Sequence, residues 1–277
     1  MIGCYVSPVS YIVPSLLGSR VPCIPIVHDL IAFRHEPHDL KAMGVERLTL
    51  GKVVRSARHI CVVSTATKID LLTRYGSLAP SSVTPIFAGS VMDDSTGNTP
   101  DGSTILCIGT LCPRKNQKRL IEAFASLPVP LRKTHRLLLV GGRGWKDHDI
   151  IAHARKMEGV EWTSYLPDAD CRLLLKTATI FAFPSLYEGF GMPVLDALAR
   201  GIPVMTSDRG SLKEVAGEAA VYVDPESVAS IAKGLERLLT DTSLRHTLSS
   251  QGREQAATFT WPRTVDLFVE ALGKIGL

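Results

Sequence analysis

The sequence lacks several features that would assign it to a specialised class of protein. It has no run of about 18 uninterrupted apolar residues, the length that a membrane-spanning helix needs. None of its six cysteines forms a C-x-x-C pair, and most lie in apolar stretches, so we expect reduced core cysteines in a cytosolic protein. The apolar first 30 residues are interrupted by prolines and lack the basic start of a signal peptide. They are therefore interpreted as structural.

The sequence also lacks a large excess of charge of one sign. The 31 basic and 27 acidic residues give a formal net charge of +4. This mild excess permits weak attraction to anionic lipid or to a phosphorylated ligand, but it does not indicate a nucleic-acid-binding protein. With 277 residues, 45% of them hydrophobic and 21% charged, the chain is typical of a globular protein with one large or two modest domains.

Strand and helix patterns alternate along the chain, which predicts parallel sheets covered by helices on both faces. In the first hundred residues we expect strands at 24–28, 59–63 and 83–87, and helices at 39–58 and 64–75, the second capped by Ser64. In the remainder we expect strands at 104–108, 136–140, 160–162, 180–183, 203–207 and 220–223. The helices expected there are 118–126, 149–157, 170–177, 193–200, 227–240, 243–257 and 261–275.

A polar stretch poor in apolar residues, 88–102, is the best linker in the chain. It predicts a domain boundary near residues 90–103. We therefore expect an N-terminal domain at 1–95, a C-terminal domain at 96–258, and a last helix at 259–277 that packs back toward the N-terminal domain.

The most informative stretch is PSLYEGFGMPVLD, residues 184–196, which lies between an expected strand and an expected helix. Ligands of parallel sheets bind beyond the carboxyl ends of the strands. Backbone N–H groups of such a loop and of the following helix N-terminus suit a diphosphate. Glu188 in the loop and Asp196 one turn into the helix could meet a sugar and a ribose. A glycine-rich turn with two solvated acids is the alternative.

A second loop, GTLCPRKN at 109–116, occupies the same position after an earlier strand. Arg114 and Lys115 would project toward the same sheet edge and could neutralise phosphate oxygens. A solvated basic turn is the alternative here.

Taken in order, these two stretches and SLKEVAGEAA at 211–220 resemble retaining glycosyltransferases of family 4, over residues from about Ile24 to the C-terminus. The resemblance implies the α/β GT-B fold, with two Rossmann-like domains and parallel sheets, here with an incomplete N-terminal domain. It also implies metal-independent transfer of a hexose, with retained configuration, from a nucleotide-diphosphate sugar. The Pro-Arg-Lys-Asn subgroup resembles mannosyltransferases of surface polysaccharide synthesis, so GDP-mannose is the donor we expect.

The resemblance also implies roles for single residues. Glu188 would contact hydroxyls of the donor sugar, and Asp196, where relatives have Glu, would hold the ribose. Lys115 matches the phosphate-binding lysine, and Arg114 lies beside it. The other residues expected at the nucleotide sugar are Phe190, Gly191 and Met192 at the diphosphate, Gly109 and Thr110 after the strand, and Leu166 at the base.

The N-terminal part offers one expected catalytic residue and two weak metal patterns. Val27-His-Asp-Leu30 resembles the His-Asp that contacts the transferred sugar, which assigns that contact to His28. His35 and His38 are a weak metal pattern. Asp168-Ala-Asp170 is interpreted as a helix cap, with Asp170 as the N-cap. No metal or other cofactor is implied.

Only about 25 residues precede Val27, and relatives have a longer first domain. We expect a membrane surface or a protein partner to cover the apolar segment 1–26. The expected acceptor is a glycan or a lipid-linked sugar, and the expected location is the cytoplasm or the inner face of the membrane. The main alternative is a non-catalytic or partner-dependent nucleotide-sugar-binding half of a split or truncated enzyme. Another GT-B-like enzyme, such as an epimerase, is the third hypothesis.

Overall fold

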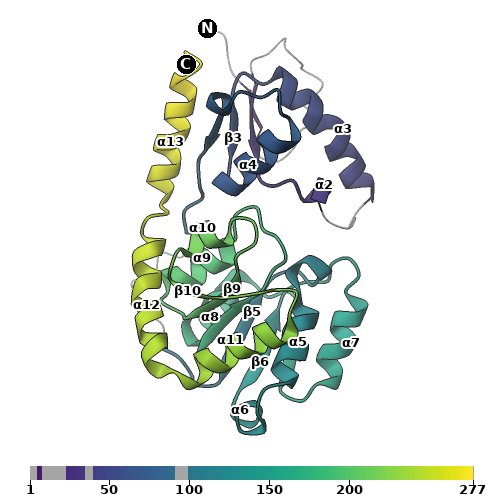
Figure 1. The fold of residues 1–277 in the computed structure, drawn as a ribbon, viewed down its shortest axis with the longest axis vertical. Helices are drawn as coiled ribbons and strands as arrows, with labels where there is room; N and C mark the ends of the chain where they lie inside the picture. Colours follow the sequence, from purple (N-terminus) through teal and green to yellow (C-terminus); the bar gives the residue numbers. More distant parts are fainter. Residues whose placement is uncertain (1–4, 8–22, 35–39, 91–98, 277) are drawn as a thin grey trace. The chain divides into compact units, whose positions relative to one another are not determined.

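A computed structural model of the chain describes residues 5–7, 23–34, 40–90 and 99–276. His35, His38 and most of the apolar segment 1–26 lie outside these ranges. The chain divides into two compact units (Figure 1). The first unit is Met1–Gly89 with Phe259–Leu277, and the second unit is Ser90–Thr258.

The second unit is built on a six-stranded parallel sheet in the order β10-β9-β8-β5-β6-β7. Its strands are β5 (Thr104–Ile108), β6 (Arg136–Val140), β7 (Val160–Trp162), β8 (Ile180–Phe183), β9 (Val204–Ser207) and β10 (Ala220–Val223). Five of these match the predicted bounds, and β9 begins one residue later than predicted. Short apolar runs predicted this sheet well because both of its faces are buried.

Helices cover both faces of this sheet. They are α5 (Gln117–Ala125), α6 (Val129–Thr134), α7 (His148–Lys156), α8 (Asp168–Thr177), α9 (Met192–Ala199), α10 (Leu212–Ala216), α11 (Val228–Thr240) and α12 (Thr242–Ala256). On one face α5 lies between α7 and α11, and Phe124, Ile150 and Leu235 join the largest apolar core there (Figure 1). On the other face α8 contacts β5, and α9 contacts β8 and β9.

In the second unit, the sequence prediction missed two short helices and misplaced one cap. The missed helices, α6 and α10, have six and five residues. Such lengths are too short to show a helical repeat. The prediction that Asp170 caps a helix is wrong, because α8 begins at Asp168 and its N-cap is Pro167. Both aspartates lie in the first turn, where negative charge is favourable beside the helix dipole.

The first unit holds a smaller parallel sheet in the order β1-β2-β3-β4. Its elements are β1 (Tyr5–Ser7), β2 (Cys23–Val27), α2 (Ile31–Arg34), α3 (Leu40–Ser56), β3 (Ile60–Val62), α4 (Thr65–Arg74), β4 (Val83–Pro85) and α13 (Trp261–Gly273). Ser64 caps α4 as predicted, accepting a hydrogen bond from the Thr67 N–H at 3.0 Å. Ala271 of α13 packs with Ile24 and Cys61 of this sheet. The two parallel sheets confirm the α/β fold class.

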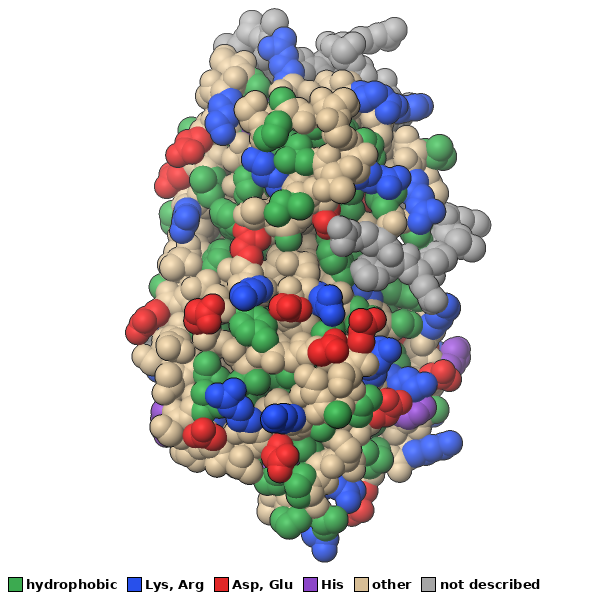
Figure 2. Space-filling view, in the orientation of Figure 1, with side chains coloured by type: hydrophobic (Ala, Val, Ile, Leu, Met, Phe, Trp, Pro, Cys, Tyr) green, Lys and Arg blue, Asp and Glu red, His purple; other side chains and the backbone are tan. Residues whose placement is uncertain are grey.

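Acidic and basic side chains are interspersed over the face of the second unit shown in Figure 2. Among the residues that the structure describes, none of the helices is long and apolar enough to span a membrane.

Candidate functional site

Two loops meet at the carboxyl ends of β5 and β8. The first loop contains a 3-10 turn, η3 (Pro113–Lys115), which ends at Asn116 in the left-handed conformation, with φ 62°. The side-chain amide of Asn116 donates hydrogen bonds to the carbonyls of Pro184 at 2.9 Å and Pro225 at 2.6 Å. The buried Asn116 therefore ties the first loop to the start of the second.

The tie brings Lys115 and Arg114 to the carboxylate of Glu188, which lies 73 residues away in the sequence. Lys115 Nζ lies 2.7 Å and Arg114 Nη1 lies 2.9 Å from Glu188 Oε1. The Ser185 hydroxyl donates to the same oxygen at 2.6 Å. We call these four residues the Glu188 cluster. The side chains of its two cations are only 13% and 12% exposed.

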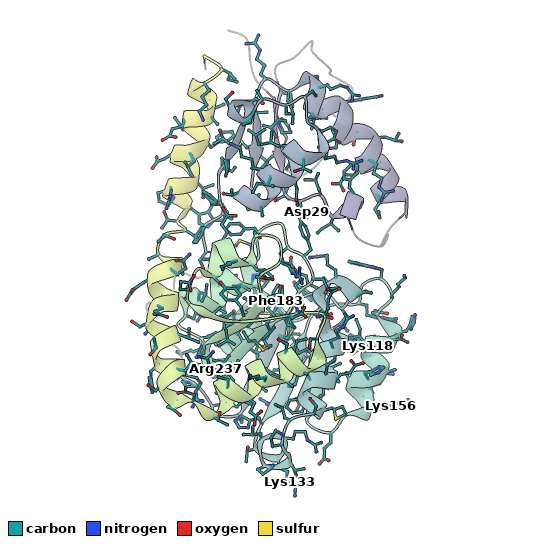
Figure 3. All side chains as sticks on the ribbon, in the orientation of Figure 1. Asp29, Lys118, Lys133, Lys156, Phe183 and Arg237 are labelled. Atoms are coloured by element: carbon teal, nitrogen blue, oxygen red, sulfur yellow. The ribbon has the colours of Figure 1, made fainter. Side chains whose placement is uncertain are left out.

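The cluster keeps Glu188 ionised. Burial alone would raise the pKa of this carboxyl, but the charges of Lys115 and Arg114 outweigh burial and hold the pKa below its usual value. Lys115 Nζ also lies 4.7 Å from the ring centroid of Phe183, the last residue of β8 (Figure 3). This cation–π contact adds to the attraction that fixes the ammonium group. Two cations share one acid, so the cluster carries a net positive charge.

The rest of the second loop is held by Ser211, which directly precedes α10. Its hydroxyl donates to the carbonyl of Phe190 at 2.6 Å, and its N–H donates to the carbonyl of Glu188 at 3.2 Å. Gly191 is the N-cap of α9, with φ 100°, a region that favours glycine. Met192 begins the helix. Gly191 has no side chain to cap α9, so the helix N-terminus can receive an anion.

Asp196 lies on α9, one turn from the helix start, and is only 9% exposed. Its Oδ1 accepts a hydrogen bond from the Ser90 hydroxyl at 2.9 Å. The structure therefore places a serine of the predicted boundary segment against the carboxylate that the resemblance assigns to the ribose.

The remaining predicted residues lie on neighbouring loops of the second unit. The Gly109 N–H donates to the carbonyl of Val140 at 2.8 Å, and the exposed Thr110 follows. The Thr110 carbonyl accepts a hydrogen bond from Gln117 Nε2 at 3.0 Å. Leu166 is half-buried between β7 and α8. Their contacts with a nucleotide stay a prediction.

His28 belongs to the first unit, where it directly follows β2 and is exposed. Its carbonyl accepts a hydrogen bond from the Thr67 hydroxyl at 3.3 Å. Glu46 on α3 was not predicted as a functional residue. Burial and the nearby charge of Asp29 raise the pKa of Glu46 to about 7.

Three residues of the site were missed by sequence reasoning: Ser185, Ser211 and Asn116. All three lie in the conspicuous stretches at 109–116, 184–196 and 211–220, so their hydrogen-bonding side chains were a usable signal. Ser185 precedes Glu188 by three residues, but nothing in the sequence shows that the loop folds the hydroxyl back onto the carboxylate. Among the described residues, no group of three or more potential metal ligands is found.

Residues 92–255 match the family model of the glycosyl transferases, group 1. The chain belongs to this family. It is 38% identical over 159 residues to the O-antigen chain mannosyltransferase B of Escherichia coli, which covers 56% of this chain and 42% of that relative. It is 28% identical over 234 residues to an MMP alpha-(1->4)-mannosyltransferase of Mycolicibacterium hassiacum, covering 81% of this chain and 57% of that one. The chain thus spans about half the length of these curated relatives.

Solved structures share the fold. Sucrose-phosphate synthase from Thermosynechococcus elongatus superposes with a TM-score of 0.81 at 20% identity, over 98% of this chain and 73% of that one. Anabaena HepE, solved in complex with UDP and glucose, superposes with a TM-score of 0.75 at 18% identity, over 92% of this chain and 72% of that one. The predicted GT-B fold and the membership of a glycosyltransferase family are confirmed.

Proposed function

We propose that the second unit binds a nucleotide-diphosphate sugar and that the chain transfers the hexose to a glycan or a lipid-linked acceptor with retention of configuration. The observation that carries this proposal is the Glu188 cluster. It gathers two cations beside the N-terminus of α9, at the sheet edge where parallel α/β folds bind ligands.

The charge balance of the cluster suits a diphosphate. Glu188 neutralises one of the two cationic charges, so one positive charge remains for the phosphate oxygens. When the bond between the sugar and the diphosphate breaks, negative charge grows on the leaving group. Fixed cations and the amide groups at the α9 N-terminus stabilise that charge without reorganising. Glu188 holds both cations in place and, by the family resemblance, faces the sugar hydroxyls.

Mannose, carried by GDP, is the sugar that we propose. Support comes from the name of the Escherichia coli relative, a mannosyltransferase of the O-antigen chain, and of the Mycolicibacterium relative, also a mannosyltransferase. The ribose contact is proposed for Asp196 and the sugar contact for His28.

Calorimetric titration of the chain with GDP, UDP and ADP tests the donor site. We expect GDP to bind, and Lys115→Ala to weaken binding about 10- to 100-fold, since it removes a charge-assisted hydrogen bond to the diphosphate. Lys118→Ala is the matched control, because Lys118 lies three residues further along and is exposed (Figure 3). It should leave the affinity unchanged.

The possible results test the donor site, the choice of nucleotide base and catalysis separately. Binding of UDP or ADP in place of GDP would keep the donor site and overturn the choice of base. Absence of binding by all three would overturn the donor site. Binding of GDP without transfer of mannose to any glycan or lipid-linked acceptor would favour the nucleotide-sugar-binding half as the function of this chain.

A further inference from the structure

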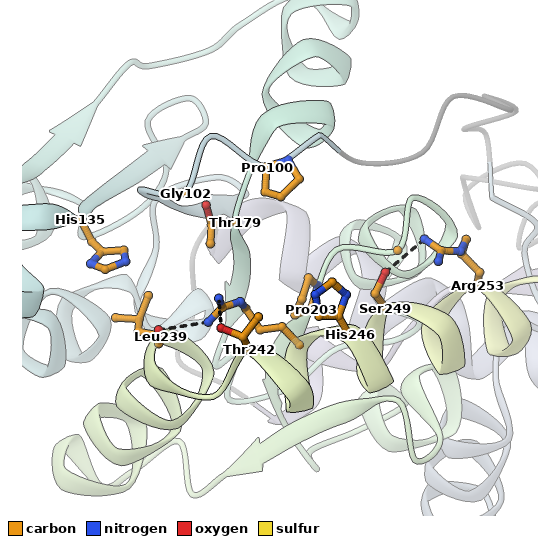
Figure 4. A pocket seen from close by; sticks show the side chains of 12 residues that line it. Pro100, Gly102, His135, Thr179, Pro203, Leu239, Thr242, His246, Ser249 and Arg253 are labelled. Carbon is orange, nitrogen blue, oxygen red and sulfur yellow. Dashed lines mark hydrogen bonds between the residues drawn. The ribbon is translucent and has the colours of Figure 1, made fainter.

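A cavity lies at the other end of the six-stranded sheet, where its strands begin. It has a volume of about 410 Å³, within the range of about 300–1,000 Å³ that is usual for small-molecule sites. One wall is formed where three neighbouring strands begin, by Gly102, Thr179 and Pro203 ahead of β5, β8 and β9 (Figure 4). The Glu188 cluster lies at the carboxyl ends of the same strands, which at about 3.3 Å per residue is about 15 Å away.

The other wall is one face of α12. His246, Ser249 and Arg253 lie three to four residues apart, so their side chains share a face of the helix (Figure 4). Arg245 precedes His246 on the same wall, and His135, at the end of α6, completes the lining. Every charged or titratable residue in the lining is therefore an arginine or a histidine. We call these four residues the basic pocket: His135, Arg245, His246 and Arg253.

The side chains of the basic pocket are not paired with acids. Among the described residues, none of its four side chains forms an ion pair. Three acids directly adjoin lining residues in the sequence, Asp101, Asp241 and Glu254, and each accepts a hydrogen bond from another group. Asp101 accepts hydrogen bonds from the N–H groups of Ser103 at 2.9 Å and Thr104 at 2.8 Å. Asp241 caps α12, accepting from the Leu244 N–H at 2.8 Å.

The two arginines differ in how many N–H groups they leave for a ligand. Arg245 Nη1 donates to the carbonyls of Leu238 at 2.6 Å and Leu239 at 3.0 Å, so Arg245 closes the C-terminal end of α11. The guanidinium of Arg253 makes one hydrogen bond in the described part of the chain, from Nη1 to the Ser249 hydroxyl at 3.1 Å. Most of its planar set of donors therefore faces the cavity or solvent, in the geometry that binds phosphate oxygens in pairs.

We propose that this basic pocket binds a small phosphate monoester. A ligand with a phosphate dianion suits two arginines and two histidines better than a ligand with a single carboxylate. The apolar part of the lining, Pro100, Pro203 and Leu239, offers contact to the carbon skeleton of the ligand. The pocket and the proposed donor site lie at opposite ends of the strands, so the two sites are separate and the proposal does not depend on the proposed function.

Calorimetric titration with glycerol 3-phosphate tests the proposal, with glycerol as the uncharged control. We expect the phosphate ester to bind and glycerol not to bind. The double variant His246→Ala/Arg253→Gln should weaken binding at least about tenfold, because it removes the imidazole and the guanidinium donors from the lining. His246→Glu, which places a carboxylate on an exposed position of the lining, should weaken it as well.

The matched control is His148→Ala/Arg155→Gln. These residues are also exposed, also seven positions apart and also on one helix of the same unit, α7. This pair and Lys115→Ala should leave the binding of glycerol 3-phosphate unchanged. The proposal is overturned if the ester does not bind, if both double variants weaken binding equally, or if only Lys115→Ala weakens it, which would place the phosphate at the Glu188 cluster.

Discussion

The two ends of the six-stranded sheet hold positive charge in different ways. At the carboxyl end, Lys115 and Arg114 share the buried carboxylate of Glu188. At the amino end, Arg245 and Arg253 have no acidic partner within the described part of the chain. Buried cations need an acid nearby, whereas cations that stay in contact with water do not. Stability should therefore depend strongly on the charges of the first end and weakly on those of the second.

Removing the acid at the carboxyl end should have the largest effect. Glu188→Ala leaves two nearly buried cations without their partner, and breaking a buried pair costs about 3–5 kcal/mol of unfolding free energy. Urea unfolding measures the loss. Glu226→Ala is the control, since Glu226 is 70% exposed and lies 4.0 Å from Arg209, and it should cost less than about 1 kcal/mol.

The variant His246→Ala/Arg253→Gln completes that comparison at the amino end of the sheet. Both side chains are exposed, so the stability should change by no more than about 0.5 kcal/mol. A loss as large as that of Glu188→Ala would show that the basic pocket is a structural element of the fold, and the contrast between the two ends would fail.

Two glycines with positive φ extend the comparison to the backbone. Gly210 has φ 61° and Gly102 has φ 78°. A Cβ on Gly210 would lie 2.9 Å from the Glu188 nitrogen and would also meet the Glu188 carbonyl oxygen, whereas a Cβ on Gly102 would meet nothing within 4 Å. In both Ala variants the left-handed conformation should lower the free energy of unfolding by about 1–2 kcal/mol.

The clash adds to this cost only at Gly210, so Gly210→Ala should lose about 2–4 kcal/mol in total. The midpoints of urea unfolding of the two variants measure the difference. Gly210→Ala should also weaken nucleotide binding, because it displaces the backbone of Glu188, and Gly102→Ala should not. Equal loss of stability in both variants would show that the backbone moves to remove the clash between residue 210 and Glu188 without a cost in stability.

The ionisation of Glu188 predicts a pH dependence. Its pKa in the folded protein is below the usual value of 4.5. The stability that this charge contributes is therefore complete above the unfolded-state pKa and is lost as the pH falls from 4.5 through the lower folded-state pKa. Glu188→Gln has no charge to lose, so its deficit relative to the wild-type protein should shrink below pH 4.5. A Glu188→Gln deficit that stays constant down to pH 3 would contradict the prediction.

Sequence reasoning succeeded where the physical rule is local or periodic. The buried strands β5, β6 and β8 were predicted to the residue, because apolar runs between turn residues mark strands buried on both faces. The loops that carry Lys115 and Glu188 were predicted to reach one edge, because parallel strands end together.

Contacts between distant loops could not be derived in this way. No periodicity shows that Asn116 ties the two loops together or that Ser185 turns back onto Glu188. The cap predicted at Asp170 failed because Pro167, with φ −57°, already provides the entry into α8. The basic pocket was missed because nothing in the sequence shows that His135 and Arg253 line one cavity where three strands begin.

A smaller effect than at Glu188 is expected for the acid at the amino end of the sheet, Asp101. Its pKa is also lowered, but for another reason. Burial raises it, and hydrogen bonds from Thr104, Ser103 and Thr179 outweigh burial. No cation is left unpaired when this charge is removed, so Asp101→Asn should cost only about 1 kcal/mol, the net value of one or two hydrogen bonds. Urea unfolding of Asp101→Asn beside Glu188→Gln checks this order. If Asp101→Asn were the more damaging of the two, hydrogen bonds rather than paired charges would be the stronger constraint on the ends of this sheet.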